Sequence, residues 1–308
     1  MRYGIGYQAV AKIESLNGGM ALDERLPFDG FDAGGVGRSV AALPMPETPT
    51  FLSRLRPRFQ IHVFDQVPST NQTLWDMVDA KAGTVAIAHR QTAGKGQRGK
   101  QWISPPGGVY LSLMLEPDWP ADQSAQLTLC TAWGIVSQFR HLGIPADIKW
   151  PNDIVVAGRK LGGILSESKL DQGIITRAVI GVGINVHNPV PATGITWQDL
   201  TQTNDNYSAS PLKKVAAAVL LGIWRGVFYR NYTDGKTFID AYQSLLTNLN
   251  MPVILEGQTL KVVGVTETGH LTLKLASQDS ALTGQPIDQL VHIKSGEFSL
   301  GYPQTTTS

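Results

Sequence analysis

Gln91-Thr92-Ala93-Gly94-Lys95-Gly96-Gln97-Arg98-Gly99-Lys100-Gln101-Trp102 is the stretch on which the fold assignment of this chain depends. Between Gly94 and Lys100 it holds three glycines and three basic residues in seven positions. Glycine lets the backbone turn and approach a ligand closely, and lysine and arginine neutralise phosphate groups. The composition predicts a loop that binds a polyphosphate or an adenylate, although a solvated basic hairpin loop would explain the charges alone.

The same glycines form the pattern G-x-G-x-x-G, which also marks the dinucleotide-binding turn of Rossmann folds. That turn opens directly into a helix whose N-terminus receives the pyrophosphate. Here the loop continues into Pro105-Pro106-Gly107-Gly108 and then into the strand-like, apolar residues 109–115. Because no helix can begin there, the context argues against a Rossmann fold.

Three further motifs surround this loop. Ser69-Thr70-Asn71 precedes a helix-like stretch, for which Ser69 or Thr70 could be the N-cap. Lys149-Trp150-Pro151-Asn152-Asp153 leads into an apolar run, and Arg159-Lys160-Leu161-Gly162-Gly163 follows after a short turn. In order and approximate spacing, the four motifs resemble the signature of the biotin protein ligases, and the resemblance extends over about residues 59–300.

The resemblance implies an α/β (α+β) catalytic domain with a central mixed β-sheet flanked by helices, of the class II synthetase-like type, and a small C-terminal SH3-like β-barrel. The residue pattern agrees with this fold class. It predicts strands at 61–64, 84–88 and 109–115, a buried strand pair at 174–186 around Gly181 and Gly183, helices at 72–80, 121–141, 211–229 and 236–249, and short C-terminal strands at 253–256, 260–266, 271–275 and 290–294.

Three parts of the chain follow from this pattern. Residues 1–56 are expected to be an N-terminal extension of uncertain structure, residues 57–250 the catalytic domain and residues 251–308 the C-terminal domain. Glycines and prolines interrupt the extension. It contains no convincing pair of helices of the kind that binds DNA in some relatives, so DNA binding is not expected.

The resemblance also implies the reaction. Biotin would be activated by ATP to biotinyl-5'-AMP with release of pyrophosphate, and then transferred to a lysine of a biotin carboxyl carrier protein or of a carboxylase domain. ATP and biotin would be substrates, with Mg²⁺ present. Two alternatives stay open: a lipoate protein ligase, and a non-catalytic biotin-sensing or adenylate-binding protein. The complete motifs at 94–100 and 149–153 argue against the first, and the retained lysines argue against the second.

The first step brings two anions together, so the site needs cations that neutralise charge. On the resemblance, the catalytic residues are Lys160, Lys95, Arg98 and Lys149, with Lys160 the most important. The residues expected to bind biotin are Ser69, Thr70, Asn71, Gln91, Lys95, Gly96, Gln97, Lys160 and Gly163. Those expected to bind ATP or the adenylate are Gly94, Arg98, Lys100, Trp102, Lys149, Asn152, Asp153 and Asn185. Asp153 is also the candidate Mg²⁺ ligand, or else a turn residue after Pro151.

Two positions depart from the family pattern. Gln97 stands where many relatives have an arginine that helps retain the adenylate, which predicts somewhat weaker retention in this chain unless Arg98 or Lys100 compensates. Gly301 stands where some relatives have an arginine, so the C-terminal contribution to the ATP site stays open.

Composition excludes several other classes. The chain has 308 residues, a length that suggests about two domains, and a formal charge of +1, which offers no global field for nucleic acid. Its single cysteine, Cys130, suits a reducing compartment, and the six histidines show no metal-ligand spacing. No apolar run has the length of a membrane span and no signal pattern opens the chain. A cytoplasmic protein is expected, and a homodimer formed through a sheet edge stays open.

Overall fold

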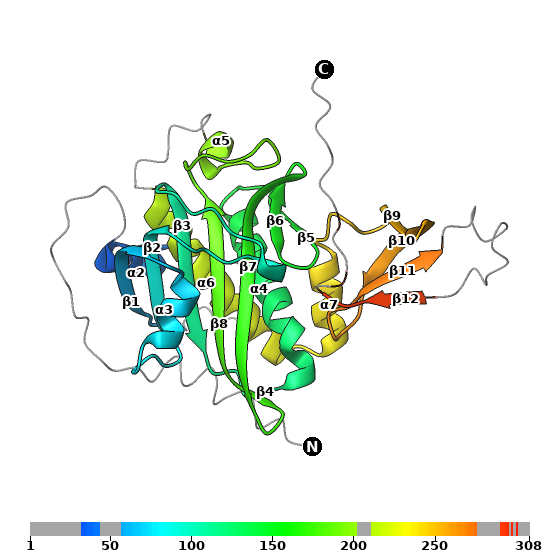
Figure 1. Ribbon diagram of the computed structural model, residues 1–308, viewed down its shortest axis with the longest axis horizontal. Coiled ribbons are helices and arrows are strands. Elements are labelled where there is room, and N and C mark those ends of the chain that lie inside the picture. Colours follow the sequence, from blue (N-terminus) through cyan, green and yellow to red (C-terminus); the bar gives the residue numbers. More distant parts are fainter. Residues whose placement is uncertain are drawn as a thin grey trace.

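The structure is a computed structural model, which describes residues 32–43, 57–201, 211–275, 290–295, 297 and 300. Its centre is an eight-stranded sheet with the order β1-β2-β3-β8-β7-β6-β5, in which β4 also pairs with β8 (Figure 1). β1 and β2 run parallel, and every other pair described for this sheet is antiparallel. The predicted mixed sheet is therefore confirmed. Its strands are β1 (Gln60–Val67), β2 (Thr84–Gln91), β3 (Gly108–Leu115), β4 (Trp119–Pro120), β5 (Asp147–Lys149), β6 (Asp153–Val156), β7 (Arg159–Asp171) and β8 (Ile174–Asn185).

The two faces of the sheet bury different helices. Alternate side chains of β3 point to opposite faces, and Leu113 belongs to the large core that also contains residues of α4 and α6, whereas Met114 packs with Leu74 of α3. Helices α2, α4, α6 and α7 contribute to the large core, and α3 covers the other face. Their bounds are α2 (Ala33–Ala42), α3 (Thr70–Asp76), α4 (Ser124–His141), α5 (Trp197–Thr201), α6 (Pro211–Tyr232) and α7 (Gly235–Gln243).

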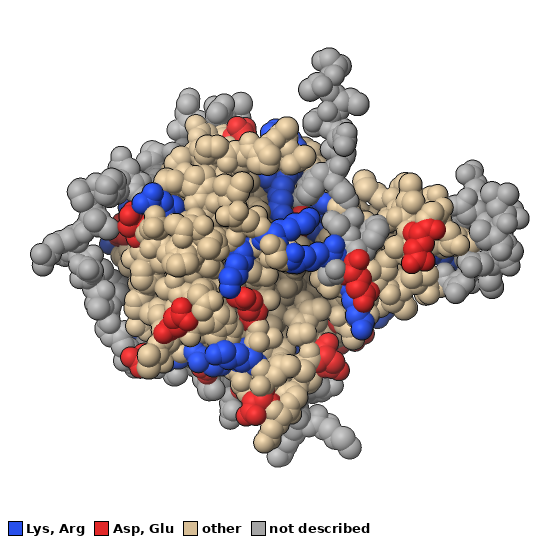
Figure 2. Space-filling model, in the orientation of Figure 1, with Lys and Arg blue, Asp and Glu red and all other residues tan. Residues whose placement is uncertain are grey.

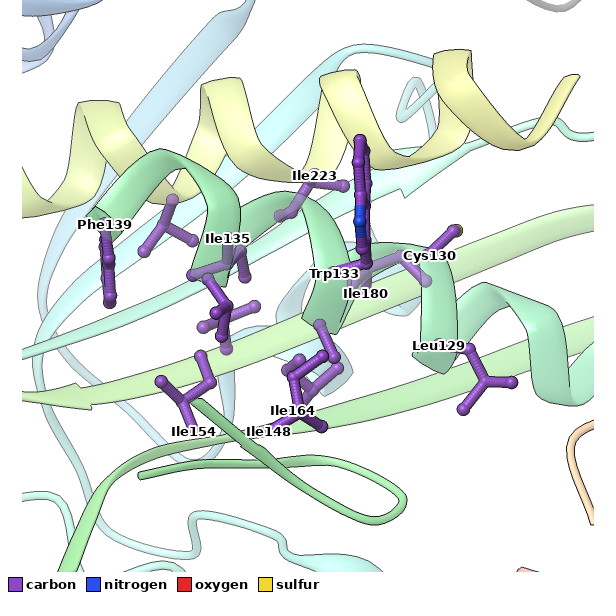
Figure 3. Packing of buried hydrophobic residues seen from close by; sticks show 14 of the residues in the cluster. Leu129, Cys130, Trp133, Ile135, Phe139, Ile148, Ile154, Ile164, Ile180 and Ile223 are labelled. Carbon is purple, nitrogen blue, oxygen red and sulfur yellow. The ribbon is translucent and has the colours of Figure 1, made fainter. Parts of the chain in front are cut away.

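Helix α4 is the centre of the large core. Figure 3 shows it between α6, which contributes Ile223, and the strands that contribute Ile148, Ile154 and Ile180. All four of these isoleucines are inaccessible to solvent, and burying each contributes about 1.5–3 kcal/mol. Gly134 of α4 faces the backbone of Gly222 in α6 so closely that an added Cβ would collide with it. This packing supports the strands whose ends form the site.

Several expected elements differ in extent. The predicted strand pair at 174–186 is wrong, because β8 is one continuous strand of twelve residues. Gly181 and Gly183 look like a turn in the sequence, but in the strand they let Asn71 and Trp102 approach the sheet closely. Residues 159–171 form β7, which the sequence did not predict as a strand. The helix expected at 72–80 ends at Asp76, and the one expected at 236–249 ends at Gln243.

The C-terminal strands form a second sheet with the order β12-β11-β10-β9, from β9 (Pro252–Leu255), β10 (Gln258–Val265), β11 (Leu271–Leu275) and β12 (Leu290–Ile293). All four predicted strands are present, but the expected barrel is not: among the described residues the sheet is not closed. Alternation of apolar residues determines which face is buried but not whether the edge strands meet. Trp150 ties this sheet to the large one, because its Nε1 donates to the carbonyl of Gly269 over 3.2 Å.

Helix α2 lies within the segment whose structure the sequence left uncertain. It packs against α6 and β1 and buries Val36 and Val40 in the large core. Asp32 caps its N-terminus by accepting from the amide of Gly35 and pairs with Nζ of Lys213 at 2.7 Å. The departure at Gly301 lies outside the described residues. Within the described part of the chain, no helix combines the length and the apolar character that crossing a membrane requires.

Candidate active site

A cavity of about 610 Å³ lies on the α3 side of the large sheet. The wall includes the loop after β2, the turn between β5 and β6, the first residues of β7 and the last residues of β8, together with residues 188–191, 193 and 194. Of the site residues expected from sequence, all but Gly94 line it. Figure 2 shows lysine and arginine side chains gathered around the hollow in the middle of this face.

One end of the cavity is strongly basic. Its lining includes Lys95, Arg98, Lys100, Lys149 and Lys160, and Asp153 is the one acidic residue among the described residues that line it. A concave surface with an excess of positive charge concentrates anions, because the low-dielectric walls focus the field. This end of the cavity therefore suits a polyphosphate.

Both the side chain and the backbone of Lys160 are held by neighbouring residues. Its Nζ lies 2.5 Å from Oδ1 of Asp153 and 5.2 Å from the centroid of the Trp102 ring. Its backbone is fixed as well: the amide donates to the carbonyl of Thr193 at 2.8 Å, and its carbonyl accepts from Nδ2 of Asn185 at 3.2 Å. The ammonium group is therefore positioned before any substrate binds, which is the condition for effective electrostatic catalysis.

Lys149, in β5, is the most buried cation of the site, at 8% exposure. Burial lowers its pKa from the ordinary value of 10.5 to about 8; the nearby Asp153 opposes this shift, and Lys160 and Lys100 add to it. A bound anion would favour the charged form of this lysine. The side chain is therefore suited to a ligand that brings negative charge.

The glycine-rich loop is a small hairpin. Lys95 pairs with Gln101 in an antiparallel bridge, and the amide of Gly96 donates to the carbonyl of Lys100 at 2.6 Å. Arg98 adopts a left-handed backbone with φ of 60°, an uncommon conformation for a residue other than glycine. The loop thus presents its basic side chains at the cavity mouth.

Gly94 has a different position from the one expected. It does not line the cavity, and a Cβ at this position would collide with the carbonyl of Trp102 and with Oγ of Ser104. Glycine is therefore required here for the packing of the loop on itself. The structure gives no support to Gly94 as a contact of the adenylate.

Trp102 closes the side of the basic end. Its indole lies against Gly183 of β8, where any side chain would occupy the space of the ring. Its Nε1 is buried and has no hydrogen-bond partner among the residues that the structure describes. An unpaired buried donor costs free energy, so the packing of the ring against β8 has to offset this cost.

The other end of the cavity is polar but uncharged. Oε1 of Gln91 accepts from the amide of Thr70 at 2.8 Å and from its hydroxyl at 3.2 Å. Ser69, Thr70 and Asn71 are all buried. Ser69 occupies the N-cap position of α3 but makes no capping hydrogen bond through its side chain, so capping does not explain it.

Two partners of Asn71 at this end were not predicted from the sequence: Ser112, which is buried, and Glu167, which is partly buried. The hydroxyl of Ser112, in β3, lies 2.6 Å from Oδ1 of Asn71, and Oε2 of Glu167, in β7, accepts from Nδ2 of the same asparagine at 2.7 Å. The available signal was weak: Ser112 is a serine inside an otherwise largely apolar strand. Asn71 is therefore held by two strands that neighbour it only in space.

Two asparagines expected to bind the nucleotide also make structural contacts. Nδ2 of Asn152 donates to the carbonyl of Ile164 at 2.8 Å and thereby joins the turn after β5 to β7. Asn185 is fixed by Asn188, whose Nδ2 donates to Oδ1 of Asn185 at 3.1 Å. The residues after β8, which the sequence analysis did not include, thus complete the wall beside Lys160.

Comparison with known proteins gives a consistent result. Residues 63–185 match the biotin/lipoate A/B protein ligase family. The chain is 40% identical over 220 residues to the bifunctional ligase/repressor BirA of Bacillus spizizenii, an alignment that covers 68% of each protein. It is 34% identical over 208 residues to BirA of Escherichia coli, covering 63% of this chain and 62% of that protein.

A solved structure agrees with these relatives. The fold matches a biotin protein ligase from Aquifex aeolicus in complex with biotin and ATP with a TM-score of 0.63 and 27% identity, over 79% of this chain and 98% of that one. Sequence motifs, fold and relatives thus point in one direction, and the chain belongs to the biotin protein ligases within the biotin/lipoate A/B protein ligase family.

Proposed function

We propose that this protein activates biotin with ATP to form biotinyl-5'-AMP and then transfers the biotinyl group to a lysine of a carrier protein. The observation that carries the proposal is the polarity of the cavity, which joins an uncharged hydrogen-bonding end to a basic end. Biotin has the same division, with a neutral cyclic urea at one end and a carboxylate at the other. A neutral urea must be recognised through hydrogen bonds in a desolvated pocket, whereas the carboxylate and ATP require cations.

In the proposed binding mode the urea lies at Ser69, Thr70 and Asn71, with Gln91 beside them. Serine and threonine hydroxyls both donate and accept, so they can match the carbonyl and the N–H groups of a urea. Gly163 leaves room along the wall for the valeryl chain, which then points toward Lys160. Gly96 and Gln97 cover the mouth.

In the first step a carboxylate oxygen of biotin attacks the α-phosphorus of ATP. A bond from oxygen to phosphorus forms, the bond to the bridging oxygen breaks, and pyrophosphate leaves with its electron pair. Lys160 stabilises the charge on the carboxylate and the new ester oxygen, while Lys95, Arg98 and Lys149 reduce the repulsion between the reacting anions. These groups act by position and charge, and no covalent enzyme intermediate is needed.

A magnesium ion would accompany ATP. Mg²⁺ keeps several waters and takes one or two carboxylates together with substrate phosphates. The described lining offers one carboxylate, Asp153, beside Lys160, which fits an ion held mainly by the nucleotide. Such an ion would supply charge neutralisation at the phosphates.

In the second step the amine of a carrier lysine attacks the acyl carbon of the adenylate, an amide forms and AMP leaves. The proposed partner is a biotin carboxyl carrier protein or the equivalent domain of a carboxylase. An ATP-dependent reaction on such a partner suits the cytoplasm, and so does a single buried thiol.

The test is pyrophosphate release by the purified protein with Mg-ATP and either biotin or lipoate, followed by labelling of a purified carrier domain. Biotin-dependent release and labelling are the expected result. Turnover with lipoate alone would contradict the proposal and indicate a lipoate ligase with the same fold. Biotin binding without turnover would indicate a biotin sensor.

A further inference from the structure

Ser104 lies where the glycine-rich loop returns to the sheet. It pairs with Gln91 in an antiparallel bridge, and its carbonyl accepts from the amide of Gln91 at 3.1 Å. Its side chain is 4% exposed and does not line the cavity. Contact with a substrate therefore does not explain it.

The hydroxyl of Ser104 connects two groups that do line the cavity. Nε2 of Gln91 donates to Oγ of Ser104 at 2.8 Å, and the same Oγ donates to the carbonyl of Trp102 at 2.9 Å. One hydroxyl can donate once and accept as well, so both bonds form together.

The direction of these bonds follows from the backbone. The amide of Thr70 can only donate, so the Gln91 side chain must turn its oxygen toward Thr70. Its nitrogen then faces Ser104 and donates to it. The proton of Ser104 is left for the carbonyl of Trp102. The orientation at Thr70 thus determines the orientation at Trp102.

Trp102 connects this chain of hydrogen bonds to the basic end of the cavity. Its amide donates to the carbonyl of Gly94 at 2.9 Å, so both backbone polar groups of the residue are bonded within the loop. Its ring lies 5.2 Å from Nζ of Lys160. The path from Thr70 through Gln91 and Ser104 to Trp102 therefore spans the uncharged and the basic ends of the cavity.

We infer that Ser104 is a positioning residue that couples occupation of the urea end to the arrangement of the glycine-rich loop at the nucleotide end. The inference rests on the proposed function and deepens it. A ligand that holds Thr70 and Gln91 in place also holds the carbonyl of Trp102, to which Ser104 donates. Each of the two substrates therefore helps to order the loop. Binding of biotin and binding of ATP then strengthen each other, by the same factor in both directions.

The test compares Ser104→Ala with the wild type. Biotin affinity is measured calorimetrically with and without a non-hydrolysable ATP analogue, and the ratio of the two affinities is the coupling factor. The alanine variant is expected to lose about tenfold in coupling, within the range common for linked sites, while its affinity for biotin alone changes less. Ser104→Thr, which keeps the hydroxyl, is expected to retain the wild-type coupling factor.

Ser166→Ala is the matched control. Oγ of Ser166 accepts from the hydroxyl of Thr128 at 3.0 Å, and Ser166 does not line the cavity. The Ser166→Ala substitution removes one hydrogen bond, as Ser104→Ala also removes hydrogen bonds, and it should leave the coupling factor unchanged. If Ser104→Ala fails to fold, as judged by circular dichroism, Ser104→Cys replaces it, since a thiol fills the site without leaving a cavity but forms much weaker hydrogen bonds.

Unchanged coupling in a folded Ser104→Ala or Ser104→Cys variant would overturn the inference, and so would an equal loss in Ser166→Ala. Either result, with normal biotin-dependent pyrophosphate release by the wild type, leaves the proposed function intact. A wild type that releases no pyrophosphate with biotin would overturn the proposed function and this inference together.

Discussion

Nζ of Lys160 lies 2.5 Å from Oδ1 of Asp153, and both side chains are largely buried in the wall of the cavity. Their backbones lie on neighbouring strands, β6 and β7, which pair in an antiparallel ladder. The ion pair therefore does not depend on a mobile loop. It holds the ammonium group at one point of the cavity, where a substrate carboxylate or phosphate can share it.

Lys160→Ala should reduce the rate of biotin-dependent pyrophosphate release by about 100-fold or more, because it removes a preorganised charge from the reacting oxygen. Steady-state kinetics with biotin and Mg-ATP measure the effect. Lys169→Ala is the control, since this lysine lies over the ring of Trp75 at 4.7 Å and outside the cavity lining. Equal rates for Lys160→Ala and the control would contradict the assigned role.

The pKa of Lys149, lowered by burial to about 8, predicts a pH dependence. The value of kcat/KM for ATP reports the free enzyme, so it should fall as the pH rises through about 8 and this lysine loses its charge. Lys149→Arg should move the fall in kcat/KM to higher pH. Lys149→Met should lower kcat/KM at pH 7 and abolish the fall at about pH 8. If Lys149→Met shows the same pH dependence of kcat/KM as the wild type, Lys149 is not the group whose titration causes the fall.

The same shift makes a prediction about stability. The folded protein binds this proton less tightly than the unfolded chain, so between pH 8 and 10.5 the unfolded state holds more protons and stability gains with rising pH. Below pH 8 the cost of the buried charge is fully present. Lys149→Met should therefore raise Tm relative to the wild type at pH 7, and the difference should shrink by pH 10. Thermal unfolding at both pH values is the measurement.

Gln97→Arg should slow the release of biotinyl-5'-AMP. Gln97 lines the cavity mouth, and a hydrogen bond from a charged donor contributes roughly 1 kcal/mol more than a neutral one, which corresponds to about fivefold in the release rate. Release is followed by trapping the adenylate after a single turnover. Equal rates in the two proteins would show that Arg98 or Lys100 already supplies the missing charge.

Gly183→Ala should displace Trp102, because an added Cβ would occupy the space of its indole ring. Both the affinity for biotin and the rate of adenylation should fall, and the tryptophan fluorescence should change. Gly37→Ala is a suitable control: this helical glycine has open space around it, and alanine there should be neutral or stabilising by about 1 kcal/mol. Wild-type activity in Gly183→Ala would show that the ring can move without consequence.

Helix α2 predicts the outcome of a truncation. A chain that begins at Pro57 loses the burial of Val36 and Val40 and the ion pair between Asp32 and Lys213. Its Tm should be lower by roughly 5 to 10 °C than that of a chain beginning at Asp32. If the two chains unfold at the same temperature, α2 contributes nothing to the stability of the large core.

The sequence predicted several strands of the large sheet and the basic residues that line the cavity, because both signals are local. Apolar runs marked β2 and β3, and the cations of the site stand in short motifs between residues 94 and 160. Ser104 and Ser112 could not be found in this way. Each is an ordinary serine in the sequence. The β-bridge between Gln91 and Ser104 and the packing of α3 against β3 bring their partners beside them, and no pattern of spacing predicts these contacts.

Other differences have the same origin. β8 looked like two strands because its glycines resemble a turn, although their function is to admit Asn71 and Trp102 from other segments. The predicted C-terminal barrel is an open sheet among the described residues for a related reason: each strand follows from alternation, but closure depends on how β9 and β12 lie relative to each other. Helix α2 was not predicted from the sequence, because its glycines weaken the helical signal and because its stability comes from packing against α6.

The single strand β8 has one more consequence. Gly181 faces Asn71, Gly183 faces Trp102, and Asn185 binds the carbonyl of Lys160, so positions two residues apart on this strand contact residues from both ends of the cavity. Insertion or deletion of one residue within 181–185 would turn some of these positions to the opposite side. The length of this short segment therefore cannot change without separating Asn71, Trp102 and Lys160, and its two glycines cannot gain side chains without displacing Asn71 or Trp102.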